Sequence, residues 1–281
     1  MNELLTSDSP HGPTAAPRLP QSLPARIGII IPACNEEPCL ARVLEELLAT
    51  VDAAKFVVAV GVNASTDRTA EIARQYPVVV AETPERGYGF GCRAAIDALR
   101  RHDSRVAAYV FFAADGASDP QDIAALVSGY QRGSAMVLGT RTTSRLNWAA
   151  MTFPHVLANF TLGAWCGVLT RRWFTDLAPH RLITRELFEA IAPREMTFGW
   201  TIEAQVAAAM LGAPICEVPA RERERVAGEQ KVSGVTWRRT FVIGCRILAA
   251  GWRTRSRFAP RRAECRNPAA VELVAQPQAG A

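Results

Sequence analysis

Residues 110–120 read VFFAADGASDP, and this stretch decides the fold of the chain. An apolar run typical of a buried strand leads to Asp115, and a second carboxylate, Asp119, stands directly before Pro120. Asp is a preferred helix N-cap and Pro is favoured at the first helical position, so the pattern predicts a strand, a turn and a helix. In α/β proteins ligands bind beyond the carboxyl ends of strands, which makes Asp115 a candidate site residue. We interpret Asp119 as the cap.

Around this stretch, segments of strand and helix character alternate. The strand-like segments are 27–32, 55–62, 78–80, 106–112 and 135–138, and helical patterns cover 37–48, 69–75 and 87–101. This alternation predicts an α/β fold, with a doubly wound, mostly parallel sheet and helices on both faces. Further on, the pattern predicts helices at 154–170, 201–211 and 237–252, a short strand at 215–219 and a charged loop at 221–234.

Composition narrows the class of protein. The chain has 281 residues, 49% of them hydrophobic, and seven cysteines with no CxxC pair or zinc-type spacing. Such cysteines, with no signal-peptide pattern before Ile27, lead us to expect a cytoplasmic protein. No nucleic-acid-binding motif is present, so we expect no nucleic-acid partner. Only two of the 32 basic residues are lysines, Lys55 and Lys231, which draws attention to each of them.

Eight short blocks occur in an order that resembles one known family. In the first half they are IIPACNEE at 30–37, NASTDRT at 63–69, ERGYG at 85–89 and AADG at 113–116. In the second half they are TDLAPHR at 175–181, GWTIE at 199–203, EVP at 217–219, and Arg225 followed by GEQKVSG at 228–234. Together they resemble the family 2 inverting glycosyltransferases of the GT-A fold, in the branch of polyprenyl- or dolichyl-phosphate sugar transferases.

The resemblance implies a site for a nucleoside diphosphate sugar and a division of the chain. The residues implied to bind this donor are Pro32, Asn35, Glu36, Asn63, Gly87, Asp115, Arg225 and Lys231. Residues 26–140 would form the nucleotide-sugar-binding half and 141–235 the acceptor and catalytic half. The residue pattern itself predicts a basic amphipathic helix at 236–260, and composition without periodicity predicts disordered tails at 1–25 and 261–281.

The chemistry of sugar transfer fits these residue types. A divalent metal, Mg²⁺ or Mn²⁺, would neutralise the diphosphate, and Asp115 is the candidate ligand. Arg225 and Lys231 suit the leaving diphosphate, although Arg225 could instead belong to a solvated run of alternating charge. Glu203 and Asp176 are the candidate general bases. A phosphate acceptor needs no strong base, in which case either carboxylate could only position other groups.

Three positions depart from the family pattern. Ala113 stands where the first acid of the family's DxD motif is expected, Val62 replaces an acid at the end of the second strand, and Gln230 replaces a serine before the late lysine. Three hypotheses follow. The chain transfers sugar to a lipid phosphate such as polyprenyl phosphate, as in cell-envelope synthesis; or to a small phosphorylated metabolite; or it is a silent relative that binds a nucleotide or a protein.

The C-terminal region is strongly basic. Nine arginines fall between residues 236 and 266, against the single acid Glu264. A helix with Trp and Phe on one face and arginines around them suits an anionic membrane surface, here the inner face of the cell membrane. The alternative is a core helix with a solvated basic face.

Overall fold

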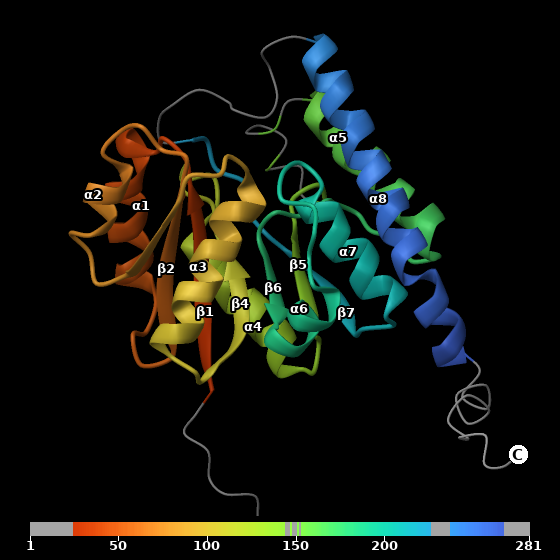
Figure 1. Ribbon diagram of the computed structural model, residues 1–281, viewed down its shortest axis with the longest axis horizontal. Coiled ribbons are helices and arrows are strands. Elements are labelled where there is room, and N and C mark those ends of the chain that lie inside the picture. Colours follow the sequence, from red (N-terminus) through yellow and green to blue (C-terminus); the bar gives the residue numbers. More distant parts are fainter. Residues whose placement is uncertain (1–24, 144–146, 148–150, 152, 226–236, 267–281) are drawn as a thin grey trace, which may run out of the picture.

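The computed structural model describes residues 25–143, 147, 151, 153–225 and 237–266 (Figure 1). Within them, seven strands form one sheet in the order β3-β2-β1-β4-β6-β5-β7. The strands are β1 (Arg26–Ala33), β2 (Phe56–Asn63), β3 (Val79–Thr83), β4 (Val106–Phe111), β5 (Met136–Thr140), β6 (Arg181–Thr184) and β7 (Ile215–Pro219). β6 runs antiparallel to both of its neighbours, and every other pairing is parallel, so the prediction of a mostly parallel sheet is confirmed.

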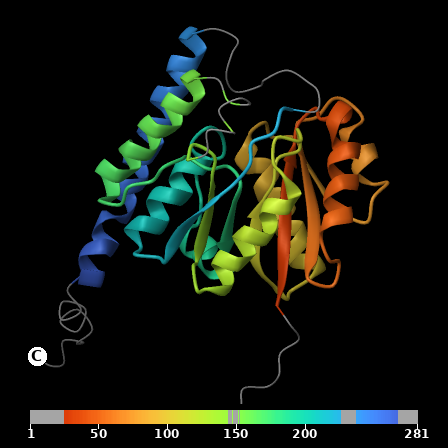
Figure 2. The ribbon, with the colours of Figure 1, turned by 180° about the vertical axis from the view of Figure 1, so that it is seen from behind.

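Helices cover both faces of the sheet, as Figures 1 and 2 show from opposite sides. They are α1 (Glu37–Thr50), α2 (Thr69–Ala73), α3 (Tyr88–His102), α4 (Ile123–Gln131), α5 (Phe153–Thr170), α6 (Arg185–Ile191), α7 (Trp200–Met210) and α8 (Trp237–Arg266), with a 3-10 turn, η1, at Pro120–Asp122. One core cluster packs α1 and α4 on the sheet, and the other packs α3, α6 and α7. Alternate residues of each strand feed the two clusters, because side chains of a strand point to opposite faces in turn.

Two glycines let α3 lie directly on β2. A Cβ placed on Gly61 would lie 1.9 Å from the carbonyl oxygen of Gly91, a separation that no side chain could occupy. The close packing fixes the N-terminal end of α3 against the last residue of β2. It therefore holds the turn before α3 beside the carboxyl edge of the sheet.

The stretch at 110–120 folds as predicted. β4 ends at Phe111, and the side chain of Asp119 accepts a hydrogen bond of 2.9 Å from the backbone N–H of Gln121. Asp119 thus caps η1, with Pro120 at its first position, and α4 follows. The interpretation of Asp119 as a cap is confirmed.

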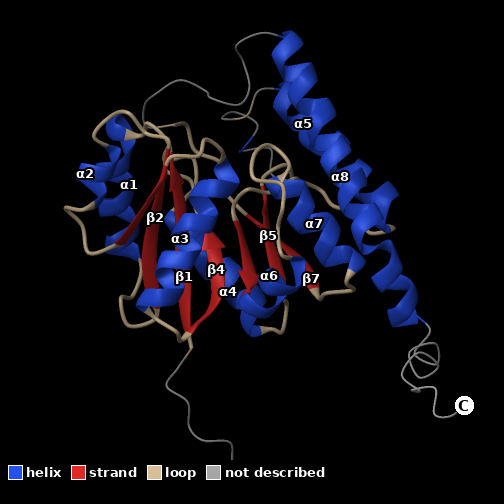
Figure 3. Cartoon of the chain, in the orientation of Figure 1, coloured by secondary structure: helices blue, strands red, loops and turns tan. Residues whose placement is uncertain are grey.

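Two elements were not predicted, and one helix is longer than expected. They are β6 and α6. β6 is only four residues long and begins with a charged residue, Arg181, that is fully buried, so it lacks the apolar run expected of a core strand. α8 continues to Arg266, beyond residue 260 where the helix was expected to end. In Figure 3, α5 and α8 lie on the opposite side of the molecule from α1 and α2. Across the described ranges, none of the helices combines the length and the apolar character needed to span a bilayer.

Candidate active site

The turns after β1 and β2 are bonded to each other. The side-chain oxygen of Asn35 accepts a hydrogen bond of 2.8 Å from the backbone N–H of Thr66, and the N–H of Glu36 donates to the hydroxyl of Thr69, also at 2.8 Å. Asn35 has a left-handed backbone, with φ of 53°, and its side chain is exposed at the edge of the sheet. The predicted donor-site residues Asn35 and Glu36 therefore stand where the carboxyl ends of two parallel strands meet, and Pro32 precedes them in β1.

Asn63 and Gly87 line the adjoining part of the same edge. Asn63 is the buried last residue of β2, and its side-chain oxygen would lie 2.7 Å from a Cβ on Gly91. Gly87 precedes α3 with φ of 152°, and a Cβ there would meet the carbonyl oxygen of Met196 at 2.6 Å. Only glycine fits this position, both for its backbone and for the close approach of the segment that contains Met196.

Asp115 contacts Arg225, although the two residues are far apart in sequence. One carboxylate oxygen of Asp115 accepts from the backbone N–H of Ala117 at 3.0 Å, which shapes the turn. The other lies 3.1 Å from Nε of Arg225. The structure therefore brings together the carboxylate and one of the two cations that the sequence had assigned to the donor site. Lys231 lies outside the described residues.

The 221–225 segment crosses the carboxyl edge and is paired, not merely solvated. Arg221 donates to Asp122 at 3.0 Å, Arg223 donates to Glu46 of α1 at 2.7 Å, and Arg225 pairs with Asp115. Every second residue thus reaches a different carboxylate of the N-terminal half. The alternative interpretation of Arg225 as part of a solvated run does not describe these contacts.

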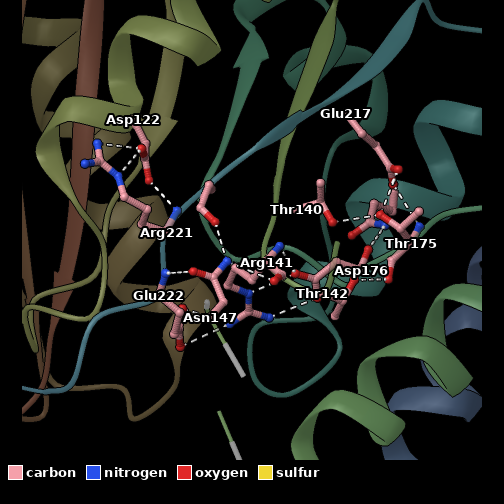
Figure 4. Close-up of polar contacts among 12 residues, drawn as sticks. Asp122, Thr140, Arg141, Thr142, Asn147, Thr175, Asp176, Glu217, Arg221 and Glu222 are labelled. Carbon is pink, nitrogen blue, oxygen red and sulfur yellow. Dashed lines mark hydrogen bonds and ion pairs between the residues drawn. The ribbon is translucent and has the colours of Figure 1, made fainter. Parts of the chain in front are cut away.

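Asp176 lies in a buried ion pair with Arg141. Its carboxylate accepts from the backbone N–H and from Nε of Arg141, both at 2.9 Å, and from Nη2 at 3.0 Å. Asp176 is 1% exposed, and Arg141 also lies 3.4 Å from Glu222 (Figure 4). Burial works against the charge of Arg141, but Asp176 and Glu222 outweigh it and raise the pKa of the guanidinium. Burial also raises the pKa of Glu222, against the influence of Arg141.

Arg141 was not among the residues predicted for the site. It follows β5 directly, so the rule that singled out Asp115 at the end of β4 applies to Arg141 as well. Its backbone carbonyl accepts from the side chain of Asn147 at 2.9 Å, and the same amide group donates to the carbonyl of Ala220 at 2.7 Å. Asn147 therefore ties the end of β5 to the start of the 221–225 segment (Figure 4).

Glu217, from the EVP block, holds the chain before Asp176. It accepts from the backbone N–H of Thr175 at 3.0 Å and from its hydroxyl at 2.9 Å. The hydroxyl of Thr140 lies 2.7 Å from that of Thr175, so β5 and β7 both fix this turn. The carboxylate of Asp176 is thereby presented to Arg141.

Glu203 joins α7 to two other segments. Its carboxylate is buried and accepts from the backbone N–H groups of Arg194 and Glu195, at 2.9 and 2.7 Å. Nη1 of Arg257 in α8 lies 3.0 Å away. Within the described part of the chain, the partners of Glu203 do not include Asp115, Asp176 or Arg225. As with Asp176, a role as general base stays a prediction.

Arg181, the last residue of the TDLAPHR block, lies inside the core. It donates from Nη1 to the carbonyl of Thr201 at 2.9 Å, and burial lowers the pKa of its guanidinium to about 10. The neighbouring His180 is also buried, and its Nδ1 lies 3.0 Å from the carbonyl oxygen of Phe111. Burial lowers the pKa of His180. Both buried side chains therefore contribute to the packing around β4 and β6.

The donor set suits a metal shared with a substrate rather than a site made by protein alone. In the part of the chain that the structure describes, no cluster of three or more His, Cys, Asp or Glu could hold a metal ion. Magnesium commonly binds through one or two carboxylates together with substrate phosphates and water. Asp115 fits this mode, because it is a partly exposed carboxylate at the carboxyl edge.

Comparisons with known proteins agree with this arrangement. Residues 28–188, more than half of the chain, match the family described as Glycosyl transferase family 2. A dolichyl-phosphate hexose transferase from Haloferax volcanii is 32% identical over 214 residues, covering 73% of this chain and 86% of that protein. An uncharacterized glycosyltransferase from Mycobacterium tuberculosis is 29% identical over 211 residues, covering 74% and 90%.

Among solved structures, glucosyl-3-phosphoglycerate synthase from Mycobacterium tuberculosis, in complex with phosphoglyceric acid, has a TM-score of 0.60 at 18% identity, covering 83% of this chain and 80% of that one. This likeness confirms the predicted GT-A type of α/β fold. Other structures of that synthase contain UDP with Mn²⁺ or Mg²⁺.

Proposed function

The chain belongs to glycosyl transferase family 2, and from that premise we propose that it transfers a sugar, with inversion, from a nucleoside diphosphate sugar to a polyprenyl phosphate. The observation that carries the proposal is the pairing of Asp115 with Arg225 at the carboxyl edge of the sheet. A departing diphosphate calls for both groups, a carboxylate to hold a divalent cation and a guanidinium to bind phosphate oxygens. The lipid acceptor is supported by the dolichyl-phosphate hexose transferase among the relatives.

Asp115 and Arg225 have complementary parts in the proposed reaction. Without donor, the guanidinium of Arg225 neutralises the carboxylate at 3.1 Å. On donor binding, Arg225 would turn to the phosphate oxygens, and Asp115 would be the protein ligand of a divalent metal, Mg²⁺ or Mn²⁺, whose charge would neutralise the leaving diphosphate. Lys231 is proposed as a second cation for the same group. Pro32, Asn35, Glu36, Asn63 and Gly87 are proposed to bind the nucleotide and sugar along the adjoining edge.

The contacts of the two candidate bases favour a phosphate acceptor. Asp176 is held by Arg141, and Glu203 by two backbone N–H groups and Arg257. Both carboxylates are 1% exposed, and these donors occupy their oxygens, so an acceptor hydroxyl would have to displace a donor to reach either of them. A phosphate oxygen needs no strong base to attack the sugar. We therefore assign both carboxylates positioning roles first, with proton transfer as the alternative for each.

A lipid acceptor implies a location at a membrane. The proposed place is the inner face of the cell membrane, since nucleotide sugars and reduced cysteines belong to the cytoplasm. The rival hypotheses, a small phosphorylated acceptor and a silent nucleotide- or protein-binding relative, differ from this one in measurable ways. Ala113 favours the silent relative, because it removes one of the two acids of the DxD motif.

Calorimetry tests the donor site. UDP- and GDP-sugars are titrated into the full chain with and without Mn²⁺, and into Asp115→Asn and Asp52→Asn. Asp52 is an exposed acid paired with Lys55 before β2, and it serves as the matched control. We expect one donor to bind in a Mn²⁺-dependent way, and Asp115→Asn alone to abolish the metal dependence. Identical isotherms for both variants would contradict the assignment of Asp115, and binding without turnover would favour the silent relative.

A further inference from the structure

Large exposed apolar side chains gather on one side of the molecule. Among the described residues, the large hydrophobic side chains that are more than 40% exposed are Leu157, Phe160, Val168, Trp173, Phe241, Val242 and Trp252. All of them lie on α5, on the turn that follows α5, or on α8. Single exposed apolar residues are ordinary, but a set confined to two neighbouring helices marks an interaction surface.

On α8 the exposed apolar residues form a stripe. Phe241 and Trp252 are eleven residues apart, about three helical turns, so they lie on the same side of the helix. The opposite side contributes Ile243, Ala250 and Phe258 to the core. α8 therefore has apolar residues on two sides: one side packs on the protein, and the other exposes aromatic side chains.

α5 shows the same arrangement. Leu157 and Val168 are also eleven residues apart and exposed, whereas Cys166 and Leu169 are buried. The two helices contact each other, since Nε1 of Trp165 donates to the carbonyl of Leu248 at 3.2 Å. They run side by side in both ribbon views (Figures 1 and 2).

Nearly all the charged residues of these two helices are positively charged. Residues 153–173 contain no acid and include Arg171 and Arg172, and α8 carries its nine arginines against Glu264. Arg246 and Arg253 are exposed on α8, about 40° and about 20° around the helix from Val242, and Arg253 also pairs with Glu195 at 2.6 Å. Exposed aromatic side chains flanked by arginines match an anionic lipid surface, where apolar groups enter the interface and cations meet the headgroups.

We propose that the outer sides of α5 and α8, with Trp173, form a docking face for an anionic lipid bilayer. The residues of this face are not those of the proposed donor site, and its binding to lipid requires no sugar. The arginines argue for lipid rather than for a second copy of the chain, since two such basic faces would repel each other.

The position of the face suits a lipid acceptor. The N-terminal ends of α5 and α8 lie at the same edge of the molecule as the carboxyl ends of β1 and β2, at the top of Figure 1. Phe241 and Leu157 belong to these ends. A bilayer that contacts them would bring a phosphate headgroup to the level of the carboxyl edge, so the chain could take its acceptor without removing it from the membrane.

Vesicle binding without donor tests the face. The full chain is mixed with vesicles of phosphatidylcholine alone or with added phosphatidylglycerol, and the bound fraction is measured by sedimentation. We expect binding that requires the anionic lipid and falls with salt. Replacing Phe241 and Trp252 together by Ala should weaken binding at least about tenfold, because both rings leave the interface. Both side chains are exposed, so the fold should be unaffected.

Two matched charge reversals distinguish binding through this face from general electrostatic attraction between the basic protein and the anionic vesicle. Arg246→Glu should lower binding to anionic vesicles roughly fivefold or more, whereas Lys55→Glu, an equal change at an exposed site before β2, should leave it unchanged. Equal loss in both variants, undiminished binding of the Phe241/Trp252 variant, or self-association that this variant abolishes would each overturn the proposal. Asp115→Asn should bind vesicles as the unaltered chain does, so failure of docking and failure of the transfer hypothesis are told apart.

Discussion

The ion pair of Asp176 with Arg141 leads to a quantitative prediction about stability. Asp176→Ala would leave the guanidinium of Arg141, which has low exposure, without the carboxylate that accepts two of its hydrogen bonds and a third from the backbone N–H of Arg141. Removing one partner of a buried ion pair costs about 3–5 kcal/mol. Glu222, 3.4 Å from Arg141, offers partial compensation. We therefore expect the free energy of unfolding to fall by about 3 kcal/mol, the lower end of that range.

Urea unfolding monitored by circular dichroism measures this loss. The control is Asp52→Ala, which breaks the exposed pair with Lys55 and should cost less than about 1 kcal/mol. Replacing Arg141 by Met and Asp176 by Leu together should recover most of the stability, because no unpaired charge remains buried. If Asp176→Ala unfolds at the same urea concentration as the unaltered chain but loses transfer, the carboxylate serves chemistry and the positioning role is wrong.

Three further predictions concern packing, an anchor and pH. Gly91→Ala should lower the free energy of unfolding by about 3 kcal/mol or more, because its Cβ would meet Asn63. Gly244→Ala, in open space on α8, should raise it by about 1 kcal/mol, and thermal unfolding compares the two variants. Glu203→Gln should cost about 2 kcal/mol and speed proteolysis of α8, and unchanged proteolysis would contradict the anchoring role. Burial lowers the pKa of His180, so its contribution to the free energy of unfolding is complete above the unfolded-state pKa near 6.5 and is lost as pH falls below it. His180→Asn should therefore reduce the pH dependence of the free energy of unfolding between about pH 7 and 5.

Much of the sheet could be predicted from the sequence because its strands are apolar runs followed by polar turns. β1, β2 and β4 show this pattern, and the strand-end rule led from β4 to Asp115. β6 does not show this pattern, because it begins with the buried Arg181, and a charged residue predicts a loop rather than a core strand. A strand of four residues is also too short for an alternating pattern to be recognised.

The partners of the site residues could not be predicted, because they come from distant segments. Residue type alone assigned Asp176 and Glu203 to proton transfer, yet each carboxylate is held by an arginine whose position depends on the whole fold. The alternating charges at 221–225 looked solvated for the same reason: their carboxylate partners belong to the N-terminal half of the chain. Arg141 was within reach of the strand-end rule, which was applied to carboxylates and not to cations.

The most direct test of the account is sugar transfer itself. The full chain is incubated with Mn²⁺, polyprenyl phosphate in anionic vesicles and the radiolabelled nucleotide sugar that calorimetry selects, and label in the lipid phase is counted. We expect transfer by the unaltered chain and by Asp52→Asn, and at least about a hundredfold loss in Asp115→Asn, since a metal-holding group at the leaving diphosphate contributes several kcal/mol. Transfer by Asp115→Asn at the unaltered rate, or label that reaches only a small phosphorylated acceptor, would contradict the account.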